Sequence, residues 1–491
     1  MNPEEKGAER VKAGRGPAWG VDELPAPMSY NRANIVKMIG PGVILLSLSI
    51  GSGEWLMGPA AVVAYGTSIL WITTVGIITQ VIFNLECSRY TLYCGEPIMI
   101  GFTRQWPGPK FWTPVWIIIS FLCLGPGWAV ASATALAAMF LNRMPGKEDQ
   151  PFVQIAGGIL FLCVIVILMF GGKIEALLER INKYVVGFIF ASLIILCVGF
   201  VPGSAWADIF TGFFKFGWLP AGKIDWFLLA GLAGYAGAGG IFNTAQSNWF
   251  RDKGYAMGGT VGYIPSLIGG RQIRVSPVGK VFRLTEENIS KFRTWWRFAV
   301  FDQTWVWGLG CWIGMFLCTL LAYGMIPTGT KLTGWAAAAH QAEGVAKVLG
   351  PVGWYWVLFI GFWVLWGTQL TVSDTFVRQV TDLLWYASPT IRQRWCKEDI
   401  RKLYYAILIA FTIWAFYMFN QGVPLHLVAL VANFANVAFF VGAIQLLFID
   451  RMLPARIRGS WLTKLGVAIL MLFYGAFMVV GLGSQLFGLK F

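Results

Sequence analysis

Long apolar stretches separated by short polar segments run along almost the whole sequence, and this alternation constrains the fold more than any other feature. A membrane-spanning helix needs about 20 mainly apolar residues, and eleven such stretches lie between residues 35 and 487. Hydrophobic residues make up 57% of the chain and charged residues only 13%, unlike the balance of a soluble protein. The sequence therefore predicts an all-α integral membrane protein with about 11 transmembrane helices.

The predicted spans are bounded by glycine, proline or charged residues. They cover about 35–65, 68–93, 111–140, 152–171, 184–202, 225–249, 298–325, 352–377, 403–419, 425–449 and 461–487. Residues 1–33 are polar and punctuated by glycine and proline, and we expect a partly disordered cytoplasmic tail. Residues 34–491 are expected to form one transmembrane domain.

The distribution of basic residues predicts the orientation of these spans. With the N-terminus in the cytoplasm, 31 of the 38 Lys and Arg residues fall on the inner side. Cytoplasmic loops are enriched in Lys and Arg, so an odd number of spans, a cytoplasmic N-terminus and an outer C-terminus are expected. A multi-pass protein of the cell membrane also explains the net charge of +14 without a nucleic-acid partner.

The first span is unusual between Gly40 and Gly58. Its apolar beginning leads into Gly51, Ser52, Gly53 and Glu54, which are two helix-weakening glycines followed by a carboxylate. A charged group within a membrane is costly and marks a functional site by default, whereas non-helical backbone survives there only where it is buried or lines a wet cavity. We expect a broken helix with an ion or substrate site at the break, the alternative being a kinked helix with Glu54 at the outer interface.

The sixth span repeats this feature, because it is rich in glycine from Gly231 to Gly240. Interruptions at corresponding positions of two halves indicate a transporter built from inverted repeats. The two repeats are predicted at about 34–203 and 225–450, followed by the additional span 461–487.

Four further motifs lie in the predicted spans. Span 1 opens with Gly40-Pro41, and span 2 ends in RYTLYCGEP. Span 3 carries SATALAAMF (132–140), and span 8 carries GTQLTVSDTFVRQ (367–379). In their order and spacing, which cover the chain from about 35 to 455, these motifs resemble the Nramp family of divalent-metal transporters. The resemblance implies a LeuT-type fold of 5+5 inverted repeats with broken helices 1 and 6, and a divalent metal ion as substrate.

The departures from this family fall at its metal site. The family's Asp-Pro-Gly-Asn aligns with residues 51–54, so that Glu54 is the surviving carboxylate, and the Met-Pro-His of span 6 aligns with about 241–243. The family's acidic pair of span 3, which is used in proton movement, becomes Gly125 and Trp128. Because soft ligands select transition metals and oxygen ligands suit harder ions, we expect a Mg²⁺ or Mn²⁺ class of substrate without tight proton coupling, as in the Nramp-related magnesium transporters.

The candidate site is rich in oxygen. The substrate-binding and ion-binding candidates are Gly51, Ser52, Glu54, Gly240, Asn243, Gln246 and Asn433, with Asn436 beside the last, and Glu54 and Asn243 are the candidate metal ligands. Amides in transmembrane helices more often bind neighbouring helices than ligands. Asp302 and Asp374 are expected to be ion-pair partners of Arg297 or Arg378, or gate residues.

Three classes of function are considered. A divalent-cation transporter comes first, and a transporter of a small organic solute or cationic amine is the alternative, since Trp55, Phe242, Trp305 and Trp307 could wall an aromatic pocket. An enzyme is disfavoured because no HExxH, nucleophile-elbow or phosphate-loop motif is present. No cofactor and no obligate protein partner is expected, whereas the lipid bilayer is the necessary environment.

Overall fold

The computed structural model describes residues 9–12, 14–330, 332, 339–419, 421 and 424–489. Within these residues, ten helical stretches are long and apolar enough to cross a membrane. An interrupted pair of helices, α11 and α12, supplies a further crossing at the sixth predicted position. The chain is a multi-pass, all-α membrane protein, as the sequence predicts.

The helices follow the predicted spans closely. The first half contains α2 (Pro41–Ser49), η2 (Ile50–Met57), α3 (Gly58–Tyr65), α4 (Trp71–Cys94), α6 (Pro109–Leu122), α7 (Gly127–Leu141), α8 (Gln150–Met169) and α9 (Ile174–Phe200). The second half contains α11 (Trp226–Tyr235), α12 (Ile241–Lys253), α13 (Glu286–Phe301), η6 (Asp302–Gly308), α14 (Leu309–Met325), α15 (His340–Ala387), α16 (Ile400–Met418), α17 (Pro424–Ile449) and α18 (Trp461–Phe487). Short helices α1 (Arg32–Met38), α5 (Ile98–Thr103) and α10 (Gly203–Gly212) connect them.

Several helices extend beyond the predicted membrane spans. Helix α13 begins at Glu286, in a segment predicted to be a polar loop, and it is capped by the Thr285 hydroxyl, which accepts a hydrogen bond from the Asn288 N–H. Helix α15 is 48 residues long and turns at Gly350, which has a positive φ of 60°. Hydropathy locates only the part of a helix that crosses the bilayer, so it does not predict polar extensions of that helix.

Part of the N-terminal tail pairs with a later segment in a small sheet. Strand β2 (Trp19–Val21) pairs antiparallel with β1 (Arg10–Val11) and parallel with β3 (Lys280–Val281). Trp19 is fully buried and packs edge-on against Tyr93. Residues 1–8 and 13 of the tail, which the sequence predicts to be partly disordered, lie outside the described residues. Among the described residues of the tail, the strands Arg10–Val11 and Trp19–Val21 belong to the small sheet.

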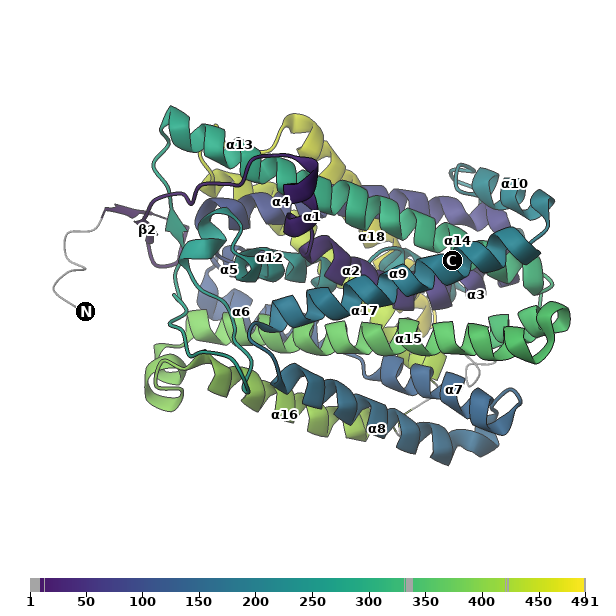
Figure 1. Cartoon of the computed structure of the whole chain (residues 1–491). Helices are drawn as coiled ribbons and strands as arrows, with labels where there is room; N and C mark the ends of the chain where they lie inside the picture. The colour runs from purple at the N-terminus through teal and green to yellow at the C-terminus, as the bar shows by residue number, and fades with distance from the viewer. Residues whose placement is uncertain are drawn as a thin grey trace.

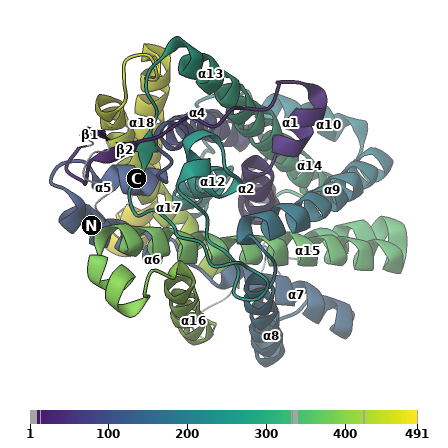
Figure 2. The same cartoon turned by 60° about the vertical axis from the view of Figure 1, so that its left-hand side comes forward.

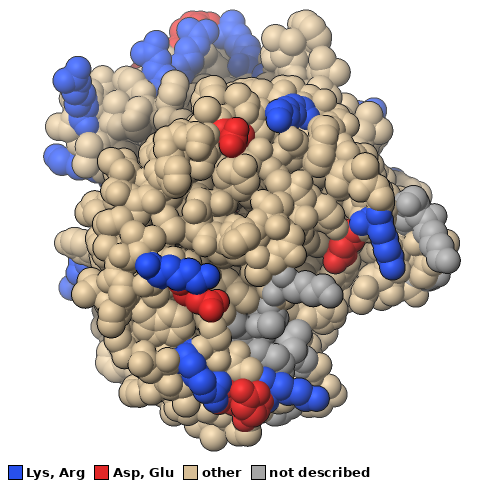
Figure 3. All heavy atoms as spheres, turned by 90° about the vertical axis from the view of Figure 1, so that its right-hand side faces the viewer, with Lys and Arg blue, Asp and Glu red and all other residues tan. Residues whose placement is uncertain are grey.

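The bundle has two distinct ends (Figure 1). The tail end carries the three strands and the N-terminus, and the opposite, far end carries α10 and the start of α15; the C-terminus lies towards the far end. Helices α2 and α12 lie in the middle of the bundle in both views (Figure 2), in contact with α4, α9, η6 and α15. The surface of the far end is mostly uncharged, with charged side chains scattered over it (Figure 3).

Candidate functional site

The first span departs from α-helical geometry at the predicted residues, but it does not unwind. Residues Ile50–Met57 form a π-helix, η2, that continues α2 into α3 without a break in the chain. The predicted interruption is therefore a widened helix. Wide π turns inside α-helices occur frequently at functional sites, and Glu54 lies in this one, about midway along Pro41–Tyr65.

Hydroxyl groups donate hydrogen bonds to the backbone carbonyls next to this wide turn. Ser52 Oγ donates to the carbonyls of Leu48 and Ser49, each at 3.2 Å. Thr368 Oγ1 of α15 donates to the carbonyls of Ser47 and Leu48. Gly51 is needed for this approach, because a Cβ there would overlap the Thr368 hydroxyl. Gly51 thus lets Thr368 join span 8 to span 1, whereas Ser52 forms its hydrogen bonds within span 1.

The sixth span is broken as predicted. Helix α11 ends at Tyr235 and α12 begins at Ile241, and the glycines at 237, 239 and 240 have φ values of 104°, 103° and 58°. Such values favour glycine. The break lies directly against span 1, since a Cβ on Gly53 would overlap the Tyr235 carbonyl oxygen. Gly240 packs in the same way against the Ala435 carbonyl of α17.

Glu54 is a buried carboxylate that has no hydrogen-bonding partner among the described residues. Its exposed fraction is 0%, and neither carboxylate oxygen receives a hydrogen bond from a described residue. Its side chain lies over Gly314 of α14, where an added Cβ would be 3.6 Å from Glu54 Cγ. The Cys311 thiol and the Gly237 N–H lie beside the carboxylate. Glu54 therefore lies where spans 1 and 7 meet the break of span 6.

Asn243 lies at the break, and its side chain is already satisfied. Its Oδ1 accepts a hydrogen bond from the Gly239 N–H at 2.9 Å, while its Nδ2 donates to Gln80 Oε1 and Asn84 Oδ1 of α4. Gln80 also binds the break directly, since its Nε2 donates to the Ala236 carbonyl at 2.6 Å. Asn243 supports the glycine segment in this structure and does not face Glu54 as a free ligand.

The sequence analysis missed Gln80 and Asn84. Their signal is two amides spaced i, i+4 in the otherwise apolar second span, which places both on one face of a helix. Asn84 also contacts Gln246. The Nε2 of Gln246 donates to the Asn84 carbonyl at 2.8 Å, and its Oε1 accepts a hydrogen bond from the Ser88 hydroxyl. Gln246 therefore belongs to the packing of α12 on α4.

The amides of span 10 contact α11. Asn433 Nδ2 donates to the Phe227 carbonyl at 3.0 Å, and Asn436 Nδ2 donates to the Ala230 carbonyl at the same distance. The Oδ1 atoms of both side chains are buried and receive no hydrogen bond from the described residues. Helices α17 and α11 are thus held together on the side of α11 that the additional helix α18 also covers.

Asp302 caps the beginning of span 1. Its two carboxylate oxygens accept hydrogen bonds from the backbone N–H groups of Gly40, at 3.1 Å, and Gly42, at 2.7 Å. Among the described residues, Asp302 forms these hydrogen bonds and no ion pair with Arg297. The N-terminus of a helix carries unpaired N–H groups and a partial positive charge that favour a carboxylate. Asp302 in η6 thus ties span 7 to span 1.

Asp374 is an ion-pair residue, as the sequence predicts for one of its two roles. The Nε and Nη2 atoms of Arg378 each lie 2.9 Å from its carboxylate, and Tyr404 donates a further hydrogen bond at 2.7 Å. Arg378 also pairs with Asp252 of α12. All four side chains are buried. The pair therefore joins α15 to α12 and α16 near the tail end.

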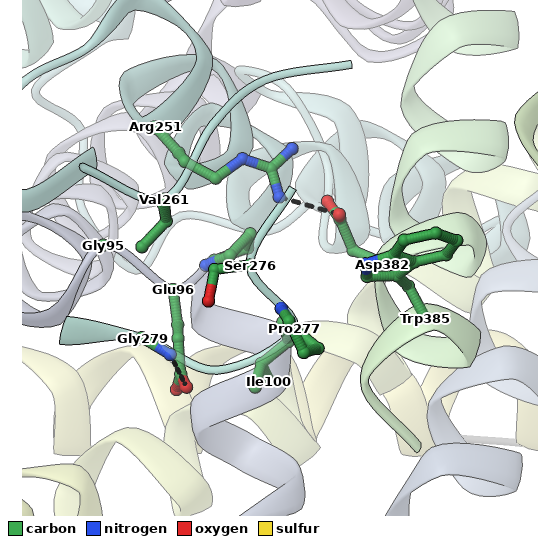
Figure 4. Close-up of a pocket in the computed structure, with 11 residues that line it drawn as sticks. Gly95, Glu96, Ile100, Arg251, Val261, Ser276, Pro277, Gly279, Asp382 and Trp385 are labelled. Atoms are coloured by element: carbon green, nitrogen blue, oxygen red, sulfur yellow. Dashed lines mark hydrogen bonds and ion pairs between the residues drawn. The ribbon is translucent and has the colours of Figure 1, made fainter. Parts of the chain in front are cut away.

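The same ion network continues towards the tail end. Arg251 bridges Asp252 and Asp382, each at 2.7 Å, and the bond to Asp382 is visible in Figure 4. The pocket in that figure also contains Glu96, which accepts a hydrogen bond from the Gly279 N–H. Burial alone would raise the pKa of Glu96, but the charge and hydrogen bonds of Arg104 hold it below the ordinary value.

The predicted aromatic wall is not assembled as expected. Trp305 is 57% exposed on the outside of the bundle, so it cannot line a buried site, and the Trp307 indole donates to Ser49 Oγ at 3.1 Å. A different cluster covers the break of span 6: the ring of Trp128 lies 5.8 Å from that of Tyr235 and 6.2 Å from that of Phe242.

Trp128 reaches this position because span 3 is itself interrupted between α6 and α7. The sequence analysis treated this span as one helix, although Gly125-Pro126-Gly127 is a clear helix-breaking signal. Gly125 lies within the interruption and Trp128 in the first turn of α7. The indole Nε1 of Trp128 and the hydroxyl of Tyr235 are buried without a hydrogen-bond partner among the described residues.

A ready-made metal centre is not present in the part of the chain that the structure describes. No group of three or more His, Cys, Asp and Glu side chains there is close enough to hold a metal ion. A cation at Glu54 would thus have one carboxylate, the neighbouring thiol, and backbone or water oxygens around it.

Comparison with known proteins gives a fold. No family model matches the chain, and no curated protein matches its sequence. Solved structures do match. The manganese transporter of Eremococcus coleocola, in complex with an aromatic bis-isothiourea substituted compound, is 14% identical in sequence. The match covers 97% of this chain and 92% of that one, with a TM-score of 0.59.

Two further structures of the same transporter agree. A variant with glutamate replaced by glutamine gives a TM-score of 0.59 and a variant with histidine replaced by alanine 0.56, each at 14% identity over 95% of this chain and 91% of that one. The resemblance that the four motifs indicate is thereby confirmed at the level of the fold. The chain has the fold of this manganese transporter along nearly its whole length.

Proposed function

We propose that this protein transports a divalent metal cation of the Mg²⁺ or Mn²⁺ class across the membrane. One observation carries the proposal: Glu54 is a fully buried carboxylate with no hydrogen-bonding partner in the described structure. An unpaired buried charge is strongly unfavourable, so a fold that keeps one has a use for it. A cation that binds there supplies the missing charge, and the similar fold of a manganese transporter supports the same reading.

The remaining ligands follow from the surroundings of Glu54. The break of span 6 brings the Gly237 N–H beside the carboxylate, and the Tyr235 carbonyl oxygen lies against Gly53, next to Glu54 in the chain. Gln80 and Asn243 hold this segment in place. A small hard cation commonly keeps several of its waters, so one carboxylate, backbone oxygens and water form a sufficient set. Asn243 then acts as a positioning residue for the break.

Alternating access would expose this site to the two sides in turn. Asp302 holds the start of span 1, and the network of Arg251, Asp252, Asp374 and Arg378 holds the tail-end half of span 6 against span 8. Both contacts close the route from Glu54 to the tail end. We propose that they open when the cation leaves on that side.

The proposal is tested by uptake of Mg²⁺ and Mn²⁺ into proteoliposomes. Glu54→Gln keeps the shape of the side chain and removes its charge, so we expect uptake to fall to background while the yield of folded protein is unchanged. Glu54→Asp keeps the charge and is expected to retain part of the activity. Glu343→Gln, which changes an exposed glutamate of α15, is the matched control. Unchanged metal uptake by Glu54→Gln would disprove the proposed site.

Transport of a small organic solute or cationic amine is the second candidate function. It is favoured by the cluster of Trp128, Tyr235 and Phe242 beside the break, which offers aromatic faces to a cation and one free indole N–H and one free hydroxyl to a polar group. A panel of radiolabelled amines and divalent metals in the same proteoliposomes separates the two. Uptake of an amine that is lost in Trp128→Leu, without any metal uptake, would favour this alternative.

We further propose that the tail end faces the cytoplasm in the cell membrane. The uneven distribution of Lys and Arg supports this orientation. Single cysteines at positions 147 and 280 of a cysteine-free variant can be tested with an impermeant maleimide. Position 147 should react in intact cells and position 280 only after lysis; the reverse pattern would show that the orientation is inverted.

A further inference from the structure

The face of α14 that covers Glu54 carries sulfur. Cys311, Gly314 and Cys318 are spaced i, i+3 and i+7, which places them on one side of a helix. Gly314 lies in the middle and leaves room for the Glu54 side chain, whose Cγ would lie 3.6 Å from an added Cβ. Both cysteines are fully buried free thiols. The carboxylate of Glu54 thus reaches the helix between two cysteines.

Cys311 is the cysteine next to the carboxylate. Its thiol lies beside both Glu54 and Ser49. Ser49 is fixed in turn, because its hydroxyl donates to the Leu45 carbonyl at 2.8 Å and accepts from the Trp307 indole at 3.1 Å. A thiol is only a weak hydrogen-bond donor, and the Glu54 oxygens remain without a hydrogen bond from the described residues. The arrangement is thus a buried carboxylate with a buried thiol beside it.

We propose that Cys311 is a second metal ligand beside Glu54 and that it extends the substrate class of the proposed transporter to thiophilic divalent cations such as Zn²⁺ and Cd²⁺. This inference rests on the proposed function. Thiolate ligands favour Zn²⁺ and softer ions, whereas Mg²⁺ and Mn²⁺ prefer oxygen. A mixed carboxylate and thiolate pair therefore binds both kinds of ion, the hard ones through Glu54 and the thiophilic ones through both side chains.

The pair of Glu54 and Cys311 changes the prediction, drawn from span 6, that the metal site has no sulfur ligand. The sequence there offers Ile241, Phe242 and Asn243 and no sulfur, which predicts a site of oxygen ligands alone. In the structure the sulfur beside Glu54 comes from span 7 instead. A thiol in an apolar position can also be a simple packing residue. The two roles differ in one measurable respect, because a packing residue does not distinguish between metals.

The experiment compares Cd²⁺ and Mn²⁺ uptake into proteoliposomes by the wild-type protein and Cys311→Ser. Serine keeps the size and polarity of the side chain but removes the thiolate. Loss of a ligand should lower Cd²⁺ uptake at least about tenfold, since even residues that only support a ligand alter metal affinity by this much, while Mn²⁺ uptake stays within about twofold. Cys87→Ser, a buried thiol of α4, and Cys163→Ser, an exposed thiol of α8, are the matched controls.

A second measurement does not depend on transport or on a folded variant. Cd²⁺ bound to a thiolate absorbs in the ultraviolet, so titration of the wild-type protein in detergent should produce this absorption, and Cys87→Ser and Cys163→Ser should retain it. Its absence at saturating Cd²⁺ would overturn the inference. Equal loss of Cd²⁺ and Mn²⁺ uptake in a folded Cys311→Ser protein, or no loss of either, would overturn it as well.

These outcomes are separate from a failure of the proposed function itself. If Glu54→Gln transports both metals as the wild type does, the site is not at Glu54, and both proposals fall. If Glu54→Gln loses both metals and Cys311→Ser loses neither, the proposed function stands and the thiol is a packing residue.

Discussion

The carboxylate of Glu54 in the middle of the bundle and the carboxylates at its tail end are buried to the same degree, but they differ in their ion-pair and hydrogen-bond partners. Asp374, Asp252 and Asp382 at the tail end each have an arginine partner within the buried network of Arg251 and Arg378. Glu54, midway along span 1, has no partner at hydrogen-bond distance in the described structure. Burial alone therefore does not identify a binding residue in this protein.

The difference has a physical meaning. A buried charge is tolerated when an opposite charge and hydrogen bonds compensate for the water it loses. In the tail-end network the protein supplies this compensation itself, and the charges join helices to each other. At Glu54 the described residues supply neither an opposite charge nor a hydrogen bond. A residue that binds a cation and then releases it must lack such a permanent partner.

The largest expected effect comes from breaking the tail-end network. Arg378→Met leaves Asp374 buried without its arginine and leaves Asp252 with Arg251 alone, and breaking a buried ion pair costs about 3–5 kcal/mol. We expect a much lower melting temperature in detergent and a lower yield of folded protein. Arg394→Met, which changes an exposed arginine, is the control and should melt as the wild type does. A normal melting temperature for Arg378→Met would mean that the network does not hold α12 to α15.

A smaller loss is expected at the start of span 1. Asp302→Ala removes the acceptor of the Gly40 and Gly42 N–H groups, and the loss of a helix cap costs about 1–2 kcal/mol. Asp302→Asn keeps an acceptor oxygen and should lose less. Thermal melts of both variants measure this order. A cap that also closes the tail-end route makes the released end of α2 more open to proteolysis, so both variants should be cut faster near residue 40.

Glu54→Gln should act in the opposite direction. Replacing an unpaired buried carboxylate by a neutral amide removes a desolvation cost, so we expect the metal-free protein to be more stable by on the order of 1 kcal/mol. In the wild type, added Mn²⁺ should raise the melting temperature, because a ligand that binds only the folded state stabilises it; in Glu54→Gln it should not. A variant that is less stable than the wild type without metal would show that Glu54 has a structural partner after all.

The sequence predicts most of the fold because membrane spans are set by hydropathy and length. The eleven crossings, the break of span 6 and the deviation of span 1 at residues 51–54 all follow from local composition. The form of the deviation in span 1 does not. Whether glycines unwind a helix or widen it into a π turn depends on what takes up the displaced carbonyls, and Thr368 comes from a helix more than 300 residues away.

The site is predicted less well for the same reason. Glu54 is visible in the sequence as the one carboxylate of its span, but its neighbours are set by packing between helices. In the sequence Asn243 resembles a ligand, but in the structure its side chain is hydrogen-bonded to Gln80 and Asn84. Cys311 resembles an ordinary apolar residue in the sequence, and only the packing of α14 against span 1 brings it beside Glu54. The break in span 3 was within reach of the sequence, because Gly125-Pro126-Gly127 announces it.

The smallest expected effect is the change that transport causes in the pH inside the proteoliposomes. Proton movement through a membrane needs titratable groups along its route, and Gly125 and Trp128 offer none where the resemblance to the Nramp family places an acidic pair. The carboxylates of the tail-end network are paired with arginines, so they are poor proton carriers. A pH-sensitive dye enclosed in proteoliposomes should therefore show no change while Mn²⁺ enters, with an externally added proton ionophore as the positive control for the dye. Acidification of the interior in proportion to Mn²⁺ uptake, present in the wild type and absent in Glu54→Gln, would contradict this prediction and would make the unpaired Glu54 carboxylate the first candidate for carrying the proton.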